Sequence, residues 1–142
     1  MSNHQSIVLE ARKAIKTPFQ KNGRSIGSGL DCFGLVIACA KNLNLKSKAG
    51  GYIYQYDRYD YSFKNNKDLL FDFFNKHCFK TNDLADGYFL IFKITDTQYH
   101  VAIKASFEMQ DTVIHSFFPT MLVVEHSLTN FWKEKIHKIF KI

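Results

Sequence analysis

The first half of the chain repeats its apolar residues at the spacing of α-helices. In residues 6–16 the apolar positions share one helical face and the charged positions share the other. Thr17-Pro18 ends that pattern. A second apolar stripe, from Asp31 to about Leu43, is typical of a buried helix. A third segment, residues 67–78, follows Asn66, a residue type that favours helix N-caps. The pattern predicts three helices before residue 80.

After Asp86-Gly87 the pattern changes to an alternation of apolar and polar residues, which is typical of strands. A short helix is predicted around residues 128–133. The segments that alternate are YFLIFKIT (88–95), YHVAIKAS (99–106), TVIHSFF (112–118), MLVVEH (121–126) and KIHKIFKI (135–142). Helices followed by an antiparallel meander predict the α+β class.

One segment, GYIYQYDRYDY at residues 51–61, fits either a strand or an extended loop. Its aromatic side chains are suited either to lining a substrate cleft or to packing against the sheet. Tyr54 and Tyr56 are therefore candidate substrate contacts, with surface or core packing as the alternative.

Size and charge narrow the function classes. A chain of 142 residues is expected to form one domain, residues 1–142, with a core of its own. Its net charge of +6 favours an acidic partner, such as an anionic wall polymer. The lysines are scattered and form no basic stripe, so we expect no nucleic-acid partner.

Cysteine usage and the N-terminal segment bear on cofactors and location. Three cysteines without zinc-ligand spacing predict reduced thiols, no metal and no cofactor. The N-terminal segment lacks the apolar core of a signal peptide, and no run approaches the length of a membrane span. We expect a protein made as a soluble cytoplasmic chain, without membrane insertion.

In the stretch GSGLDCFGLVIACA, residues 27–40, Cys32 stands where a Gly-rich segment ends and the second predicted helix begins. A thiol at a helix N-terminus feels the positive end of the helix dipole, which favours the thiolate and lowers the pKa. The backbone amides there are also suited to holding an oxyanion. The alternative is a buried structural cysteine, which is how we interpret Cys39 and Cys78.

A nucleophilic cysteine needs a base, usually a histidine oriented by a third polar group. Among six histidines, His100 and His115 stand out because each lies inside a predicted strand of one hairpin. The turn between these strands would bring the two side by side. His126 and His137 lie among charged residues and are interpreted as surface positions.

These segments resemble the NlpC superfamily of papain-like cell-wall cysteine peptidases. The matching segments are Asp31-Cys32-Phe33-Gly34-Leu35-Val36, His100-Val101-Ala102-Ile103 and Val113-Ile114-His115. TPFQKNGRS (17–25) and FWKEKIHKIF (131–140) further resemble the phage tail-associated branch. The resemblance runs from about residue 5 to the end and implies a papain-like fold.

The resemblance implies a role for each matching residue. Cys32 would be the nucleophile, His100 the general base, and His115 the residue that orients His100. The Cys32 backbone amide would contribute to an oxyanion hole. Asp31 would contact the free amine of a peptide stem, or serve only as a helix N-cap. The substrate would be an amide bond of bacterial peptidoglycan peptides, next to a γ-D-glutamyl residue.

The chain departs from the family pattern at two pocket positions. Phe19 stands where many relatives carry a tyrosine, and Phe33 replaces a small residue and is expected to narrow the substrate pocket. A tail-tip or assembly protein that no longer cleaves is one alternative; a thiol hydrolase or acyltransferase for another amide or a lipid is a second. Without a signal peptide, delivery to the wall would require a phage tail or secretion-system partner.

Overall fold

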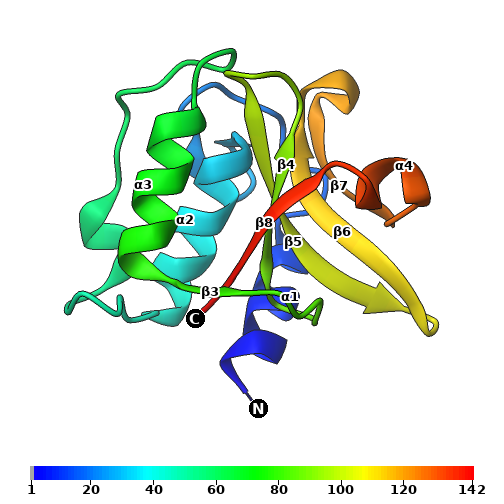
Figure 1. Cartoon of the computed structure of the whole chain (residues 1–142), viewed down its shortest axis with the longest axis horizontal. Coiled ribbons are helices and arrows are strands. Elements are labelled where there is room, and N and C mark those ends of the chain that lie inside the picture. The colour runs from blue at the N-terminus through cyan, green and yellow to red at the C-terminus, as the bar shows by residue number, and fades with distance from the viewer. Residues whose placement is uncertain (1) are drawn as a thin grey trace.

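The structure is a computed structural model that describes residues 2–142 (Figure 1). Helices and 3-10 turns are α1 (Asn3–Lys13), α2 (Cys32–Leu43), η1 (Ile53–Tyr56), α3 (Lys67–His77), η2 (Phe118–Thr120) and α4 (Asn130–Lys133). Strands are β1 (Arg24–Ser25), β2 (Gly29–Leu30), β3 (Phe79–Thr81), β4 (Phe89–Lys93), β5 (Tyr99–Phe107), β6 (Gln110–Phe117), β7 (Leu122–Ser127) and β8 (Ile136–Lys141).

Six strands form one antiparallel sheet in the order β3-β8-β4-β5-β6-β7. Strands β4 to β7 follow one another as the predicted meander, and β8 returns to pair with β4. The α+β class is thereby confirmed. The sequence pattern missed β3, because a three-residue strand shows no readable alternation and exists only by pairing with β8.

Strand β5 is buried on both faces of the sheet. Tyr99, Val101 and Ile103 belong to the main core, together with residues of α1, α2 and α3. Ala102 belongs to a second, smaller core on the other face, which Trp132 of α4 covers. Figure 1 shows α2 and α3 on one side of the sheet and α4 on the other. His100 has the same parity along β5 as Ala102, which places it on the face of the smaller core.

Helix α2 begins and ends at residues suited to those positions. The Asp31 side chain accepts a hydrogen bond from the Gly34 backbone nitrogen at 2.6 Å, so Asp31 is the N-cap. At the other end Asn44 takes the left-handed conformation, with φ of 51°, which stops the helix. Helix α1 ends at Lys13, earlier than the predicted Lys16, because Lys16 has a φ of 76° and turns the chain.

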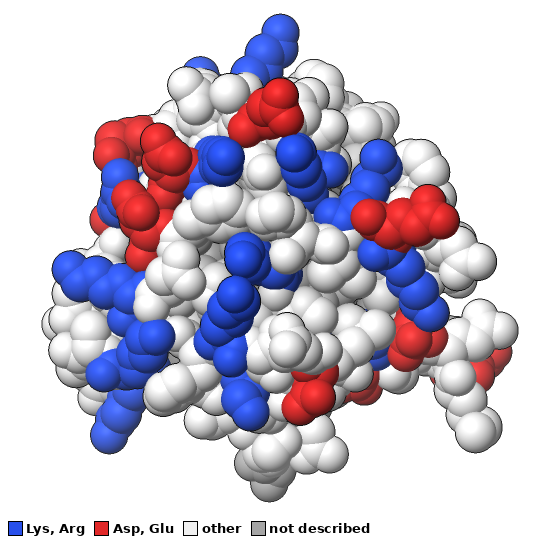
Figure 2. Space-filling model, viewed as in Figure 1, with Lys and Arg blue, Asp and Glu red and all other residues white. Residues whose placement is uncertain are grey.

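Charged side chains are spread over the molecule. Figure 2 shows Lys and Arg side chains distributed over the visible face, with Asp and Glu between them. The net charge of +6 therefore acts on this face as a diffuse field. None of the helices in residues 2–142 has the length and apolar character needed to cross a bilayer.

Gly34 allows α2 to approach the loop that precedes β1. A Cβ at this position would lie 1.9 Å from the backbone oxygen of Gly23, and a backbone atom cannot move aside cheaply. The glycine in the Asp-Cys-Phe-Gly segment is thus required by the packing of the chain against the first turn of α2.

We expect Gly34→Ala to lower the free energy of unfolding by about 1–3 kcal/mol, the usual cost of overpacking. The matched control is Gly27→Ala, where a Cβ meets nothing within 4 Å and only the positive φ of 89° opposes it. Urea titration followed by circular dichroism measures both. Equal stability of the two variants would contradict the close contact.

Candidate active site

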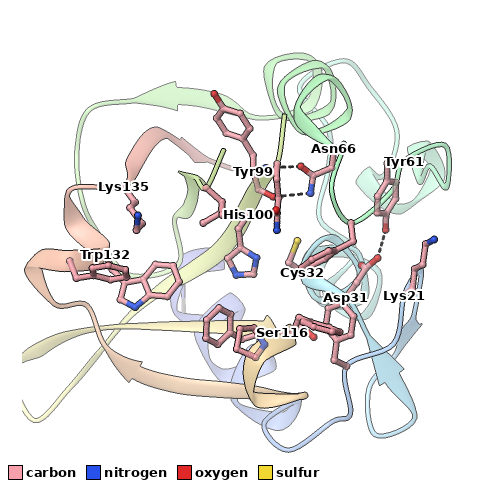
Figure 3. Close-up of a pocket in the computed structure, with 18 residues that line it drawn as sticks. Lys21, Asp31, Cys32, Tyr61, Asn66, Tyr99, His100, Ser116, Trp132 and Lys135 are labelled. Atoms are coloured by element: carbon pink, nitrogen blue, oxygen red, sulfur yellow. Dashed lines mark hydrogen bonds between the residues drawn. The ribbon is translucent and has the colours of Figure 1, made fainter. Parts of the chain in front are cut away.

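A cavity of about 340 Å³ opens where the start of α2 meets β5, β6 and α4 (Figure 3). Its volume lies in the range of small-molecule and peptide-fragment sites. Its lining is mainly aromatic, with Phe19, Tyr61, Phe63, Tyr99, Phe117, Phe118, Phe131 and Trp132. Cys32 and His100 are among the lining residues, and Figure 3 shows the Cys32 sulfur turned toward the His100 ring.

The Cys32 thiol is the first side chain of α2. Burial raises its pKa to about 12, the Asp31 carboxylate adds to the rise, and backbone N–H groups of Val101, Phe33 and Cys32 itself oppose it. The expected lowering of this pKa by the helix start is therefore wrong. The amide dipoles do favour the thiolate, but desolvation and a neighbouring negative charge outweigh them.

His100 and His115 lie side by side, which confirms the predicted juxtaposition. His100 Nε2 and His115 Nδ1 are 2.6 Å apart, because β5 and β6 are paired with Ile103 opposite Ile114. Burial is the main cause that lowers the pKa of His100, to about 4, and it also lowers that of His115. The resting site thus holds a neutral thiol beside a neutral imidazole.

Two residues that the sequence did not single out complete this part of the site. His126 Nε2 lies 2.8 Å from His115 Nε2, so a third histidine extends the pair. The Trp132 ring packs within 6.5 Å of the ring centres of all three histidines. His126 was interpreted as a surface residue from its polar neighbours. Strand alternation was the available signal, but only the pairing of His126 with Val113 reveals its direction.

Asp31 is the N-cap of α2, and its carboxylate is already occupied. Oδ1 accepts from the Gly34 nitrogen at 2.6 Å and from Arg24 at 3.2 Å. Oδ2 accepts from the Asn22 nitrogen at 2.9 Å and from the Tyr61 hydroxyl at 2.5 Å. Asp31 lines the cavity but is only 5% exposed. A substrate amine would have to displace one of these donors to reach it.

Phe33 does not line the cavity, which corrects the expectation that it narrows a substrate pocket. It is fully buried, and its ring packs edge-on against Phe73 of α3 at 4.8 Å and Tyr61 at 5.9 Å. As the second residue of α2 it faces α3, whereas Cys32 faces the cavity. Phe19 does line the cavity, in edge contact with Phe118, and offers no hydroxyl group.

Tyr54 and Tyr56 are also absent from the cavity lining, which corrects their assignment as candidate substrate contacts. Residues 53–56 of the segment form η1, and residues 57–61 continue as a loop without regular secondary structure. Tyr56 stacks on His77 at 4.2 Å and donates a hydrogen bond to the Gly50 oxygen at 2.7 Å. Tyr54 packs against the main core. Both lie on the η1 side of α2, where aromatic packing is the better account.

Asn66 holds the start of β5 in place. Its side chain donates to the Tyr99 oxygen at 2.8 Å and accepts from the Tyr99 nitrogen at 2.7 Å. It occupies the N-cap position of α3, as predicted, but its side chain makes no capping hydrogen bond. Because Tyr99 precedes His100, this clamp fixes the backbone that carries the imidazole. Within residues 2–142 no group of three or more His, Cys, Asp or Glu side chains is arranged to hold a metal ion.

We expect Asp31→Asn to lower the pKa of the Cys32 thiol, because it removes the carboxylate charge that helps to raise that pKa. The pKa stays above the ordinary value, since burial is the larger cause. The measurement is the pH dependence of alkylation by iodoacetamide; Cys39 and Cys78 are each 1% exposed and will not compete.

The matched control for this experiment is Asp57→Asn. Asp57 also binds Arg24, at 3.0 Å, but it is not among the groups that shift the Cys32 pKa. A thiol pKa that rises in Asp31→Asn, or that falls equally in both variants, would contradict the electrostatic role of Asp31.

No family model matches the chain, and no curated protein matches its sequence. Among solved structures, the chain is similar to the NlpC/p60 domain of the peptidoglycan hydrolase SagA. The TM-score is 0.62 at 21% sequence identity, and the match covers 99% of this chain and 100% of that domain. A likeness at this identity is one of fold. The chain therefore has the papain-like α+β fold of NlpC/p60 domains.

Proposed function

We propose that this protein is a cysteine hydrolase that cleaves amide bonds in peptidoglycan peptides. The observation that carries the proposal is that Cys32 and His100 line one cavity, and that His115, buried behind His100, lies 2.6 Å from its Nε2. A nucleophile beside a base that is itself oriented by a third group is the arrangement that acyl transfer requires.

The proposed reaction begins with a neutral pair. His100 takes the thiol proton of Cys32 as the sulfur attacks the carbonyl carbon, forming a C–S bond and a tetrahedral oxyanion. The backbone N–H groups of Cys32 and Phe33 lie in the first turn of α2, where they have no intrahelical acceptor, and are suited to donating to the oxyanion oxygen. The C–N bond then breaks, and His100 returns the proton to the leaving amine. Water, deprotonated by His100, then attacks the thioester carbonyl, the C–S bond breaks, the acid product leaves, and the proton on His100 returns to the Cys32 sulfur.

Peptidoglycan is the favoured substrate for two reasons. The structurally similar domain belongs to a peptidoglycan hydrolase. The net charge of +6 also attracts anionic wall polymers over long range. Lys21 and Lys135 line the cavity on opposite sides of the Cys32–His100 pair (Figure 3) and are available to carboxylates of a peptide stem. We propose the bond between γ-D-glutamate and the diamino acid as the scissile one.

We expect Cys32→Ala to abolish the release of new peptide termini from purified muropeptides, measured by mass spectrometry. The control is Cys39→Ala, a change in the core of α2 that leaves the cavity intact. Cleavage that persists in Cys32→Ala would refute the assigned nucleophile. If the wild-type protein leaves every muropeptide intact, a non-cleaving tail or assembly protein becomes the better account.

We expect the acid limb of kcat/KM to lie near pH 4, because the base must be unprotonated and burial lowers the pKa of His100 to about 4. Activity should therefore stay level as the pH falls from neutrality to about 5 and decline below that value. Initial rates, with circular dichroism at each pH to confirm folding, give the profile. A midpoint near the ordinary histidine value of about 6.5 would contradict a desolvated base.

The aromatic lining supports a second candidate, a thiol hydrolase for amides or esters with an apolar acyl group. Phe63, Phe118 and Phe131 are exposed at the cavity and would contact such a group. Parallel assays of muropeptides and of N-acyl amides with short aliphatic chains separate the two functions. Both assays depend on Cys32, so the preferred substrate distinguishes them.

A further inference from the structure

Three histidines form a continuous row that leads from the cavity to strand β7. His100 Nε2 lies 2.6 Å from His115 Nδ1, and His115 Nε2 lies 2.8 Å from His126 Nε2. The row ends where His126 Nδ1 lies 2.9 Å from the backbone oxygen of Ser127. His115, in the middle, is fully buried.

When all three imidazoles are neutral, the last contact sets the direction of the hydrogen bonds in the row. A carbonyl oxygen can only accept, so Nδ1 of His126 carries the hydrogen. In neutral His126 the other nitrogen, Nε2, is then an acceptor, and His115 must donate to it from Nε2. His115 Nδ1 is consequently an acceptor, and His100 donates to it from Nε2. His100 Nδ1 is left with a free lone pair.

We propose that His126 is a positioning residue that selects the tautomer of His100 in which Nδ1 can accept the Cys32 proton. The opposite tautomer would place a hydrogen on Nδ1 and could not act as the base. Without His126, either nitrogen of His115 could carry the hydrogen, and the row would no longer have a preferred direction. Trp132 packs against His115 and His126, with ring centroids 5.5 and 5.7 Å apart.

This inference rests on the proposed function, since a base is needed only if Cys32 is a nucleophile. The test compares His126→Phe, which keeps a ring but has no acceptor, with His126→Gln, whose amide can donate to Ser127 and accept from His115. We expect His126→Phe to lower kcat about 10-fold with KM unchanged. Losses of about this size follow the removal of a hydrogen-bond partner that orients a metal-bound histidine. His126→Gln should restore most of the activity. The control is His137→Phe, an exposed histidine outside the row.

A second measurement needs no substrate. Nitrogen-15 NMR of histidine side chains reports which ring nitrogen of His100 carries the hydrogen. We expect Nε2–H in the wild type and in His126→Gln, and a mixture of tautomers in His126→Phe. An unchanged His100 tautomer in His126→Phe, or equal activity losses in the Phe and Gln variants, would overturn the proposal. If the tautomer shifts as expected but no variant cleaves any substrate, the proposed function fails and the positioning role stands.

Discussion

The carboxylate of Asp31 accepts hydrogen bonds from groups in three separate parts of the chain. It caps α2 at Gly34, binds the loop at Asn22 and Arg24, and receives the hydroxyl of Tyr61 from the tyrosine-rich segment. The start of α2, and with it the position of the Cys32 sulfur, depends on this group. Removing the carboxylate would leave the Gly34 and Asn22 nitrogens and the Tyr61 hydroxyl without this acceptor, whereas Arg24 would keep its contact with Asp57 at 3.0 Å.

The same carboxylate shapes the chemistry beside it. A negative charge next to Cys32 disfavours the thiolate, so the helix start does not yield a reactive anion at rest. In the proposed reaction, the thiolate of Cys32 therefore forms only when His100 takes the thiol proton during attack. For this step His100 must present an unprotonated nitrogen to the sulfur. Asn66 holds the backbone next to His100 through its two hydrogen bonds to Tyr99. The contact with His115 orients the His100 ring.

The site therefore draws on both faces of the central sheet. Helix α2, in the main core, supplies the thiol, and the face covered by α4 supplies the three imidazoles and Trp132. The aromatic cavity lies between them, and Lys21 and Lys135 add positive charge to its lining.

The local pattern of apolar and polar residues was enough to predict most of the secondary structure. Helical spacing and alternation predicted α2, α3 and the meander of β4 to β7, and strand positions predicted that His100 and His115 would meet. These features follow from periodicity, which each segment carries within itself. Tertiary packing decided what depends on partners distant in sequence: the short strand β3, the burial of Phe33 against α3, and the inward direction of His126. It also reversed the expected pKa shift of Cys32, because desolvation is a property of the assembled pocket rather than of the helix start.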